Sequence, residues 1–222
     1  MILDLGLIDY EKAYLVQRKL VALRKLSRVG DSLILAEHNP IFTIGRTGSM
    51  SNLLADEKLL NARGIKVLRI DRGGDITFHG PGQIVCYPII DLKAMEYDLH
   101  KYLRSLESIA IDFFDSYHTK CDSVSGMTGA WFGDRKIASI GISASNWVTF
   151  HGMSLNVNVD LGFFSMINPC GMSSVEMTSL DRLLGRRVSI DETKVRLIEL
   201  FCERFNIMGD EIAGIECTAA LA

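Results

Sequence analysis

The chain has 222 residues, of which 48% are hydrophobic and 23% are charged, and it holds four prolines. This length is sufficient for one well-cored domain and short for two, and the composition excludes a disordered chain. The net charge of −3 gives no electrostatic basis for nucleic-acid binding, and no apolar run approaches the roughly 18–20 residues that a membrane span needs.

The N-terminal segment is not typical of an exported protein. Its first ten residues contain Asp4 and Asp9 but no basic stretch, so they predict neither a signal peptide nor a transit sequence. The cysteines are odd in number and widely spaced, without a C-x-x-C pair or the Cys/His spacing of a zinc site. We therefore expect reduced thiols, no metal and a cytoplasmic location.

The first half of the chain predicts a long helix followed mainly by strands. Apolar residues at three- and four-residue spacing indicate a helix over 9–28, with Asp9 as its N-cap. A shorter helix at 56–62 ends before Gly64. The strands expected here are 32–36, 41–44, 66–70, 75–78 and 83–89, the last three separated by glycine turns at 73–74 and 80–82.

The second half contains the clearest helix, at 98–117, where apolar residues form one continuous face. Further strands are expected at 130–132, 136–143, 148–150 and 154–159, and further helices at about 174–184 and 190–206. Because the strands are clustered and do not alternate with helices, we predict an α+β fold with mixed or antiparallel sheets flanked by helices. We expect a single domain over 1–222, with its motifs at about 35–184, a helical part at 185–208 and a loosely held tail at 209–222.

Cys170 is the cysteine with an unusual local sequence, Asn168-Pro169-Cys170-Gly171, which predicts a tight and exposed turn. A thiol is a strong nucleophile as the thiolate, which a nearby cation, base or helix N-terminus favours. The helix expected from Ser173 or Ser174 would direct its N-terminal amides at the sulfur. We interpret Cys170 as a candidate nucleophile, with a buried structural cysteine as the alternative.

Lys136 is the second candidate, in a strand-like run with Ile137, Ala138 and Ile140. A lysine held against an apolar surface can accept a proton from a thiol or pair with a thiolate. The alternative is a lysine at a strand edge that faces water.

The glycine-rich stretch 72–83 is the third candidate, with Thr77 and His79 on one side of its strand. Glycines allow a ligand to approach the backbone closely, yet the stretch is neither a dinucleotide fingerprint nor a P-loop, and two ordinary hairpin turns are the alternative. Its Phe-His-Gly tripeptide recurs at 150–152, which predicts two walls of one site or two buried core histidines. The segment 45–48 is a weaker candidate for an anion-binding turn.

Four segments together resemble the octanoyltransferases of lipoate biosynthesis, the octanoyl-acyl-carrier-protein:protein N-octanoyltransferases. They are RGGDITFHGPGQ (72–83), TGAWFGDRKIASIG (128–141), VTFHGMSLNV (148–157) and FSMINPCG (164–171), in the order and at the spacing of the family. The similarity covers about residues 35–184. Phe78 stands where the family often has tyrosine.

The resemblance implies a fold like the catalytic domain of biotin and lipoate protein ligases, and an octanoyl transfer in two steps without cofactor, metal or ATP. Cys170 would form an acyl-thioester, and Lys136 matches the lysine that favours the thiolate or acts as base. Backbone amides near Gly171 or Gly80 are candidates for stabilising the oxyanion. The residues that match the acyl site are Arg72, Gly73, Gly74, Asp75, Ile76, Thr77, Phe78, His79, Ser139, Ile140, Gly141, Gly152, Met153 and Ser154.

The implied donor is octanoyl-acyl carrier protein, and the implied acceptors are lipoyl domains of 2-oxoacid dehydrogenase E2 subunits and the glycine-cleavage H protein; nucleic acid and membrane are not expected as partners. Such partners are typically acidic, so we hypothesise that a basic helix face docks one of them, with a solvated face as the alternative. The basic residues of this face are Lys12, Arg18, Lys19, Arg24, Lys25 and Arg28.

Three other functions remain open from the sequence. An ATP-dependent lipoate–protein ligase shares the implied fold but needs no cysteine at this loop, so Cys170 favours transfer. A non-catalytic lipoyl-domain-binding protein would not need both Cys170 and Lys136. A thiol hydrolase would need a water-activating triad, which the sequence does not indicate.

Overall fold

The structure is a computed structural model that describes residues 1–206 and 212–213. Its centre is a mixed nine-stranded sheet, in which β1 pairs in parallel with β2 and β12, β11 pairs in parallel with β9, and the other neighbours are antiparallel. The strands of this sheet in spatial order are β12 (Ile212–Ala213), β1 (Ile2–Ile8), β2 (Ser32–His38), β6 (Gln83–Ile89), β10 (Val148–Asn156), β9 (Arg135–Ser145), β8 (Met127–Phe132) and β7 (Asp122–Val124), with β11 (Glu176–Met177) beside β9.

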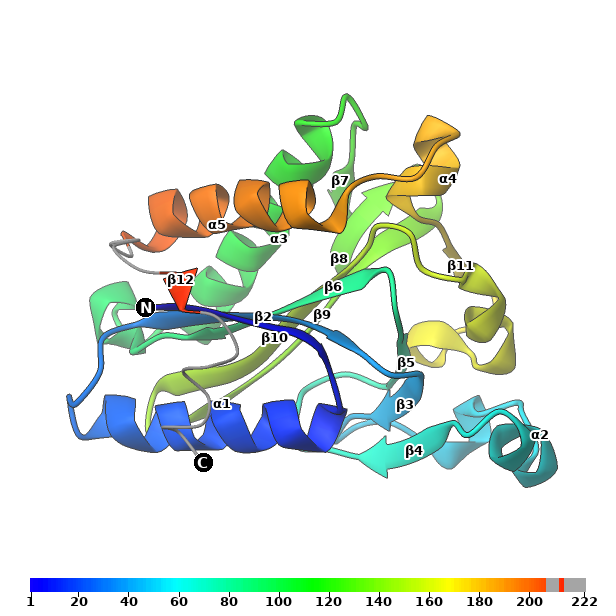
Figure 1. Cartoon of the computed structure of the whole chain (residues 1–222), viewed down its shortest axis with the longest axis horizontal. Helices are drawn as coiled ribbons and strands as arrows, with labels where there is room; N and C mark the ends of the chain where they lie inside the picture. The colour runs from blue at the N-terminus through cyan, green and yellow to red at the C-terminus, as the bar shows by residue number, and fades with distance from the viewer. Residues whose placement is uncertain (207–211, 214–222) are drawn as a thin grey trace.

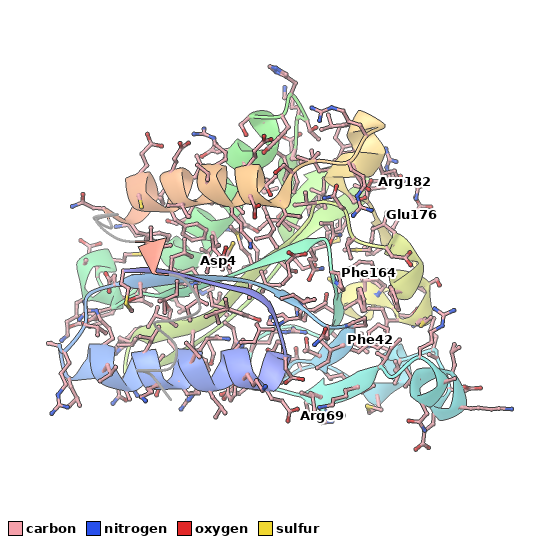
Figure 2. All side chains as sticks on the ribbon, in the orientation of Figure 1. Asp4, Phe42, Arg69, Phe164, Glu176 and Arg182 are labelled. Carbon is pink, nitrogen blue, oxygen red and sulfur yellow. The ribbon has the colours of Figure 1, made fainter. Side chains whose placement is uncertain are left out.

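Helices cover both faces of this sheet (Figure 1). Helix α1 (Tyr10–Lys25) lies on one face, and α3 (Leu99–Asp115) and α5 (Ile190–Phe205) lie on the other. Each side buries its own apolar cluster, because α1 and α3 present apolar residues at helical spacing. On the α5 side the Asp4 carboxylate of β1, labelled in Figure 2, accepts from Lys194 Nζ at 2.9 Å. The predicted α+β architecture is therefore confirmed.

A smaller three-stranded sheet lies at one end of the molecule, with strand order β4 (Lys66–Arg69), β3 (Ile41–Ile44) and β5 (Ile76–His79). It packs on a third apolar cluster that contains Phe42 and Phe164, both labelled in Figure 2. The short helices α2 (Glu57–Ala62) and α4 (Leu180–Leu184) complete the fold. The glycine-rich stretch 72–83 begins between β4 and β5, contains β5 and ends at the first residue of β6, so it connects the small sheet to the large one.

Several sequence predictions differ from the structure, and strand β7 was not predicted. Strand β1 was not predicted, because Ile2, Leu3 and Leu5 are all buried and the strand lacks alternation. The strands expected at 148–150 and 154–159 form one buried strand, β10. The helix expected at 174–184 is helical only at 180–184, because residues 176–177 pair with β9 instead and this tertiary pairing overrides a weak helix propensity.

Of the predicted loose tail, only Ile212–Ala213 is described, as strand β12; the rest lies outside the described residues. In residues 1–206 and 212–213 no helix has the length and apolar character to cross a membrane. Cys86, Cys121, Cys170 and Cys202, which all lie in the described part of the chain, are free thiols in the structure.

Candidate active site

The Cys170 loop is a tight turn, as its sequence predicts. Cys170 has φ +59° and Gly171 has φ +75°, so two consecutive residues adopt the left-handed conformation. A non-glycine residue in this conformation costs about 1–3 kcal/mol and is typical of functional sites. Two backbone hydrogen bonds within the loop stabilise the turn. Gly171 N donates to Asn168 O at 3.0 Å, and Met172 N donates to Pro169 O at 3.1 Å.

The predicted helix N-terminus beside the sulfur is wrong, because no helix begins at Ser173 or Ser174. The amides of Gly171 and Met172 are bonded to carbonyls of their own turn. Gly80 does not line the cavity beside Cys170. The backbone donors expected for an oxyanion at Gly171 and Gly80 are therefore not available in this conformation.

Lys136 is the group that contacts the thiol. Its Nζ donates to Cys170 Sγ at 3.0 Å, and the lysine is only 3% exposed. The Trp131 ring lies beside the ammonium, with its centroid 5.2 Å from Nζ. No ion pair in the described part of the chain joins Lys136 to a carboxylate. The lysine is thus not the solvent-facing residue of the alternative interpretation, and a thiolate at Cys170 would be its anionic partner.

The glycine-rich stretch is connected to the Cys170 loop through Asn52. Asp75 Oδ2 accepts from Asn52 Nδ2 at 2.8 Å, and Asn52 O accepts from Asn168 N at 2.8 Å. Asn52 had no sequence pattern to indicate it, because its two partners are distant in the chain. These bonds fix the position of Cys170 relative to the residues that follow Arg72.

A cavity extends from Cys170 and Lys136 between the glycine-rich stretch and strands β9 and β10. Every site residue that the family resemblance implied lines this cavity, except Gly73 and Phe78. The Phe78 ring is fully buried in the third apolar cluster, stacked at 4.4 Å on Phe163, so the predicted wall position of Phe78 is wrong. Gly73 instead lines a wider adjoining cleft, which also reaches Cys170 and Lys136.

Four lining residues were absent from the predicted site: Tyr10, Val85, Tyr87 and His151. Of these, only His151 had a sequence signal, the repeated Phe-His-Gly tripeptide. His79 and His151 line one cavity and are both buried, so the structure fits both interpretations of the repeat. His151 has φ +56° inside β10, which turns its ring toward Tyr10 and Tyr14 of α1. Tyr10, the first residue of α1, also lines the cavity, although it is distant in the sequence from the other site residues.

Arg72 holds the glycine-rich stretch in place. Its guanidinium is buried and donates to Thr43 O at 2.8 Å, to Thr43 Oγ1 at 3.0 Å and to Gly73 O at 2.9 Å. Burial lowers the pKa of Arg72, against an opposing effect of nearby Tyr10. The candidate turn at 45–48 packs on this stretch, since Arg46 N donates to Arg72 O at 3.0 Å. Arg72 therefore lines the cavity and, through these bonds, fixes the backbone of Thr43 and Gly73 beside it.

Burial lowers the pKa of three buried histidines at or near the cavity, His38, His79 and His151. Burial lowers the pKa of His38, which contacts Tyr87 Oη at 2.6 Å, to about 4. Burial likewise lowers the pKa of His151 to about 4, against the opposing effect of Asp71, whose Oδ1 lies 2.7 Å from His151 Nε2. Both side chains are therefore neutral in the folded protein at neutral pH.

We expect the protein to lose stability between pH 6.5 and pH 4. The folded pKa values of His38 and His151 are below the unfolded value of 6.5, so the unfolded chain binds more protons as pH falls. The expected loss by pH 5 is about 2 kcal/mol per histidine. Urea unfolding at pH 7.5, 6 and 5 measures this loss of unfolding free energy. His38→Gln should remove the part of the loss that His38 contributes. An unfolding free energy that is constant over this range would contradict the prediction.

The basic face of α1 is partly neutralised within the fold. Arg24 Nε lies 2.7 Å from Asp31 Oδ1, and Arg24 Nη1 lies 3.5 Å from Asp91 Oδ2. The sequence alone did not indicate these pairs, because α1 and Asp91 are far apart in the chain. The docking hypothesis therefore no longer includes Arg24 and depends on exposed residues such as Lys12 and Arg28.

Comparisons with known proteins show which sequences and structures this chain is similar to. Residues 9–202 match the family model described as the lipoyl protein ligase A/B catalytic domain. An "Octanoyltransferase" of Solibacter usitatus is 44% identical over 203 residues, which cover 91% of each chain. An "Octanoyltransferase" of Geobacter sp. strain M21 is 44% identical, with 86% of this chain and 90% of that protein covered. Among solved structures, lipoate-protein ligase A bound with ATP shares the fold, with a TM-score of 0.76, 16% identity, and 96% of this chain and 88% of that chain covered.

Proposed function

This chain belongs to the family of lipoyl protein ligase A/B catalytic domains, and we propose that it is one of the octanoyltransferases of that family. It transfers an octanoyl group to lipoyl-domain lysines in lipoate biosynthesis, as a single catalytic domain. The observation that carries this proposal is the 3.0 Å contact between Lys136 Nζ and Cys170 Sγ inside a cavity. A nucleophile in contact with a base is the arrangement that covalent acyl transfer requires.

In the first half-reaction Lys136 accepts the thiol proton, and the Cys170 thiolate attacks the carbonyl carbon of octanoyl-acyl carrier protein. The new bond joins Cys170 Sγ to the acyl carbon. The bond to the carrier sulfur breaks, and the departing thiolate takes the proton from the Lys136 ammonium. One thioester replaces another, so this exchange is nearly balanced and needs no ATP.

In the second half-reaction the amine of a lipoyl-domain lysine attacks the acyl-enzyme. An amide bond forms, and the bond between the acyl carbon and Cys170 Sγ breaks. Lys136, left neutral by the first half-reaction, accepts the proton that the attacking nitrogen releases and passes it to the departing Cys170 thiolate. Because an amide is more stable than a thioester, this step is downhill.

The cavity and the adjoining cleft, which meet at Cys170, bind different parts of the substrate. The inner cavity is narrow, about 60 Å³, whereas the adjoining cleft is about 430 Å³ and has Leu103, Met127 and Met172 in its wall. The inner cavity receives the acyl chain, where each buried methylene contributes about 0.8 kcal/mol. The wider cleft admits the carrier's pantetheine arm and then the acceptor lysine, since both must reach the same sulfur.

The partners follow from this chemistry. An acyl carrier protein is the donor and lipoyl domains are the acceptors, specifically those of 2-oxoacid dehydrogenase E2 subunits and of the glycine-cleavage H protein. Reduced thiols at Cys170 and elsewhere fit a cytoplasmic location.

Intact-protein mass after incubation with octanoyl-acyl carrier protein and no ATP tests the proposal. We expect wild type to gain one octanoyl group and to lose it when a lipoyl domain is added, whereas Cys170→Ala gains none. Cys86→Ala is the matched control, because burial raises the pKa of the Cys86 thiol and keeps it protonated. Modification of the lipoyl domain only with free octanoate and ATP would contradict the proposal and indicate a ligase.

A further inference from the structure

We propose that Glu107 of α3 is a positioning residue for Lys136, acting through the backbone of Gly129. This inference rests on the proposed function, in which Lys136 is the base. Glu107 has no contact with Cys170 and was not a predicted site residue. Its role follows from three features of the structure: a buried carboxylate, a glycine under the lysine chain and a shift in strand register.

The first feature is a carboxylate where an apolar side chain would be expected. Glu107 is only 2% exposed, on the face of α3 that also buries Leu106 and Ala110. Burying a carboxylate costs free energy unless it is paired and hydrogen-bonded. Oε1 accepts from Gly129 N at 3.0 Å, and Oε2 pairs with the largely exposed Arg104 guanidinium. Glu107 therefore connects α3 to one peptide group of β8.

The second feature is the position of Gly129 beneath Lys136. Gly129 has φ +137°, a conformation that other residues rarely adopt. A Cβ atom at this position would lie 2.7 Å from Lys136 Cε and would overlap the carbonyl oxygen of Ala138. The methylene chain of Lys136 thus lies directly over Gly129 Cα, where no side chain is present. The lysine chain packs against the backbone at this position.

The third feature is an irregularity in the pairing of β8 with β9 at the same place. Ala130 pairs with Ala138, but Trp131 pairs with Lys136, so β9 has one extra residue, Ile137. Such bulges redirect side chains and are common beside active sites. The irregular stretch places the Lys136 ammonium near both the Trp131 ring and Cys170 Sγ.

These features together make the Nζ–Sγ contact depend on Glu107. The Gly129 N–H has its acceptor in Glu107, and without that acceptor the N–H would be buried and unsatisfied. The backbone under Lys136 would then shift to find another partner. A displacement of about 1 Å between reacting groups can reduce a rate about 100-fold. Glu107 would thus control thiol reactivity without touching the thiol.

The test compares Glu107→Met, which keeps the length and helix propensity but has no good acceptor, with Glu107→Gln, which keeps a carbonyl oxygen for Gly129 N. Arg104→Gln is the control, because it removes the ion pair alone. The readout is the rate of Cys170 alkylation by iodoacetamide from pH 6 to pH 10, followed on the Cys170 peptide by mass spectrometry. Thermal unfolding confirms that each variant is folded, and Glu107→Ala replaces Glu107→Met if the latter does not fold.

We expect Glu107→Met to lower alkylation at pH 7 by roughly tenfold to 100-fold, with the wild-type rate recovered at high pH. Glu107→Gln and Arg104→Gln should remain within about threefold of wild type, since the Gly129 N–H keeps its acceptor. A purely structural role would lower the unfolding temperature and leave the pH profile unchanged, which would overturn the proposal. It would also be overturned if Glu107→Gln were as impaired as Glu107→Met.

The proposed function is tested separately by acyl-enzyme formation. If wild type forms no acyl-enzyme with octanoyl-acyl carrier protein, octanoyl transfer is wrong, and the alkylation profiles still decide the role of Glu107. If wild type forms the acyl-enzyme and Glu107→Met has the wild-type profile, only the positioning role is wrong.

Discussion

Lys136→Met is expected to slow acyl-enzyme formation at neutral pH by about 10²–10⁴-fold, the usual contribution of a positioned acid–base group. Methionine fills the space of the lysine chain over Gly129, so the fold should remain intact. It removes the hydrogen bond from Lys136 Nζ to Cys170 Sγ at 3.0 Å, the one side-chain hydrogen bond to this sulfur within residues 1–206 and 212–213. In the proposed mechanism both half-reactions use this proton, so transfer to the lipoyl domain should fall as well.

The measurement is the rate of octanoyl incorporation into the protein from octanoyl-acyl carrier protein, with Lys120→Met as the control because Lys120 is an exposed lysine outside the site. Raising the pH should partly restore Lys136→Met, since hydroxide can then deprotonate the thiol in place of lysine. A variant that reacts at the wild-type rate at pH 7 would show that Lys136 is not the base.

Gly152→Ala should lower the free energy of unfolding by about 3 kcal/mol or more. This is the largest loss that we expect from any glycine-to-alanine substitution in the large sheet. A Cβ at this position would overlap the carbonyl oxygen of Cys86 and lie 2.8 Å from Pro88 Cδ. Both neighbours belong to β6, which pairs with β10 at the centre of the large sheet. A backbone atom cannot rotate away as a side chain does, so the two strands would have to separate.

Urea unfolding of Gly152→Ala and Gly30→Ala gives the comparison. Gly30 has no atom within 4 Å of an added Cβ and no positive φ, so its substitution should be neutral or slightly stabilising. Equal unfolding free energies for the two variants would mean that β6 and β10 approach less closely than the structure has them.

Local sequence was sufficient for the parts of this protein that depend on neighbouring residues. The apolar spacing of 98–117 predicted α3, and Asn168-Pro169-Cys170-Gly171 predicted the tight turn at the nucleophile. Both are short-range properties, set by side-chain periodicity and by the conformations open to proline and glycine. The identity of the candidate site residues came from motif resemblance, because local patterns cannot say which loops meet.

Only the tertiary structure decided how these parts meet. It places Lys136 against Cys170, adds Tyr10, Asn52 and His151 to the site, and directs Phe78 into the core. It also replaces the helix expected beside the sulfur by a strand pair with β9. In each case the deciding contact joins residues distant in the chain, and such contacts follow from sheet register and burial. Short-range patterns determined which residues were able to react, and long-range packing determined which of them touch.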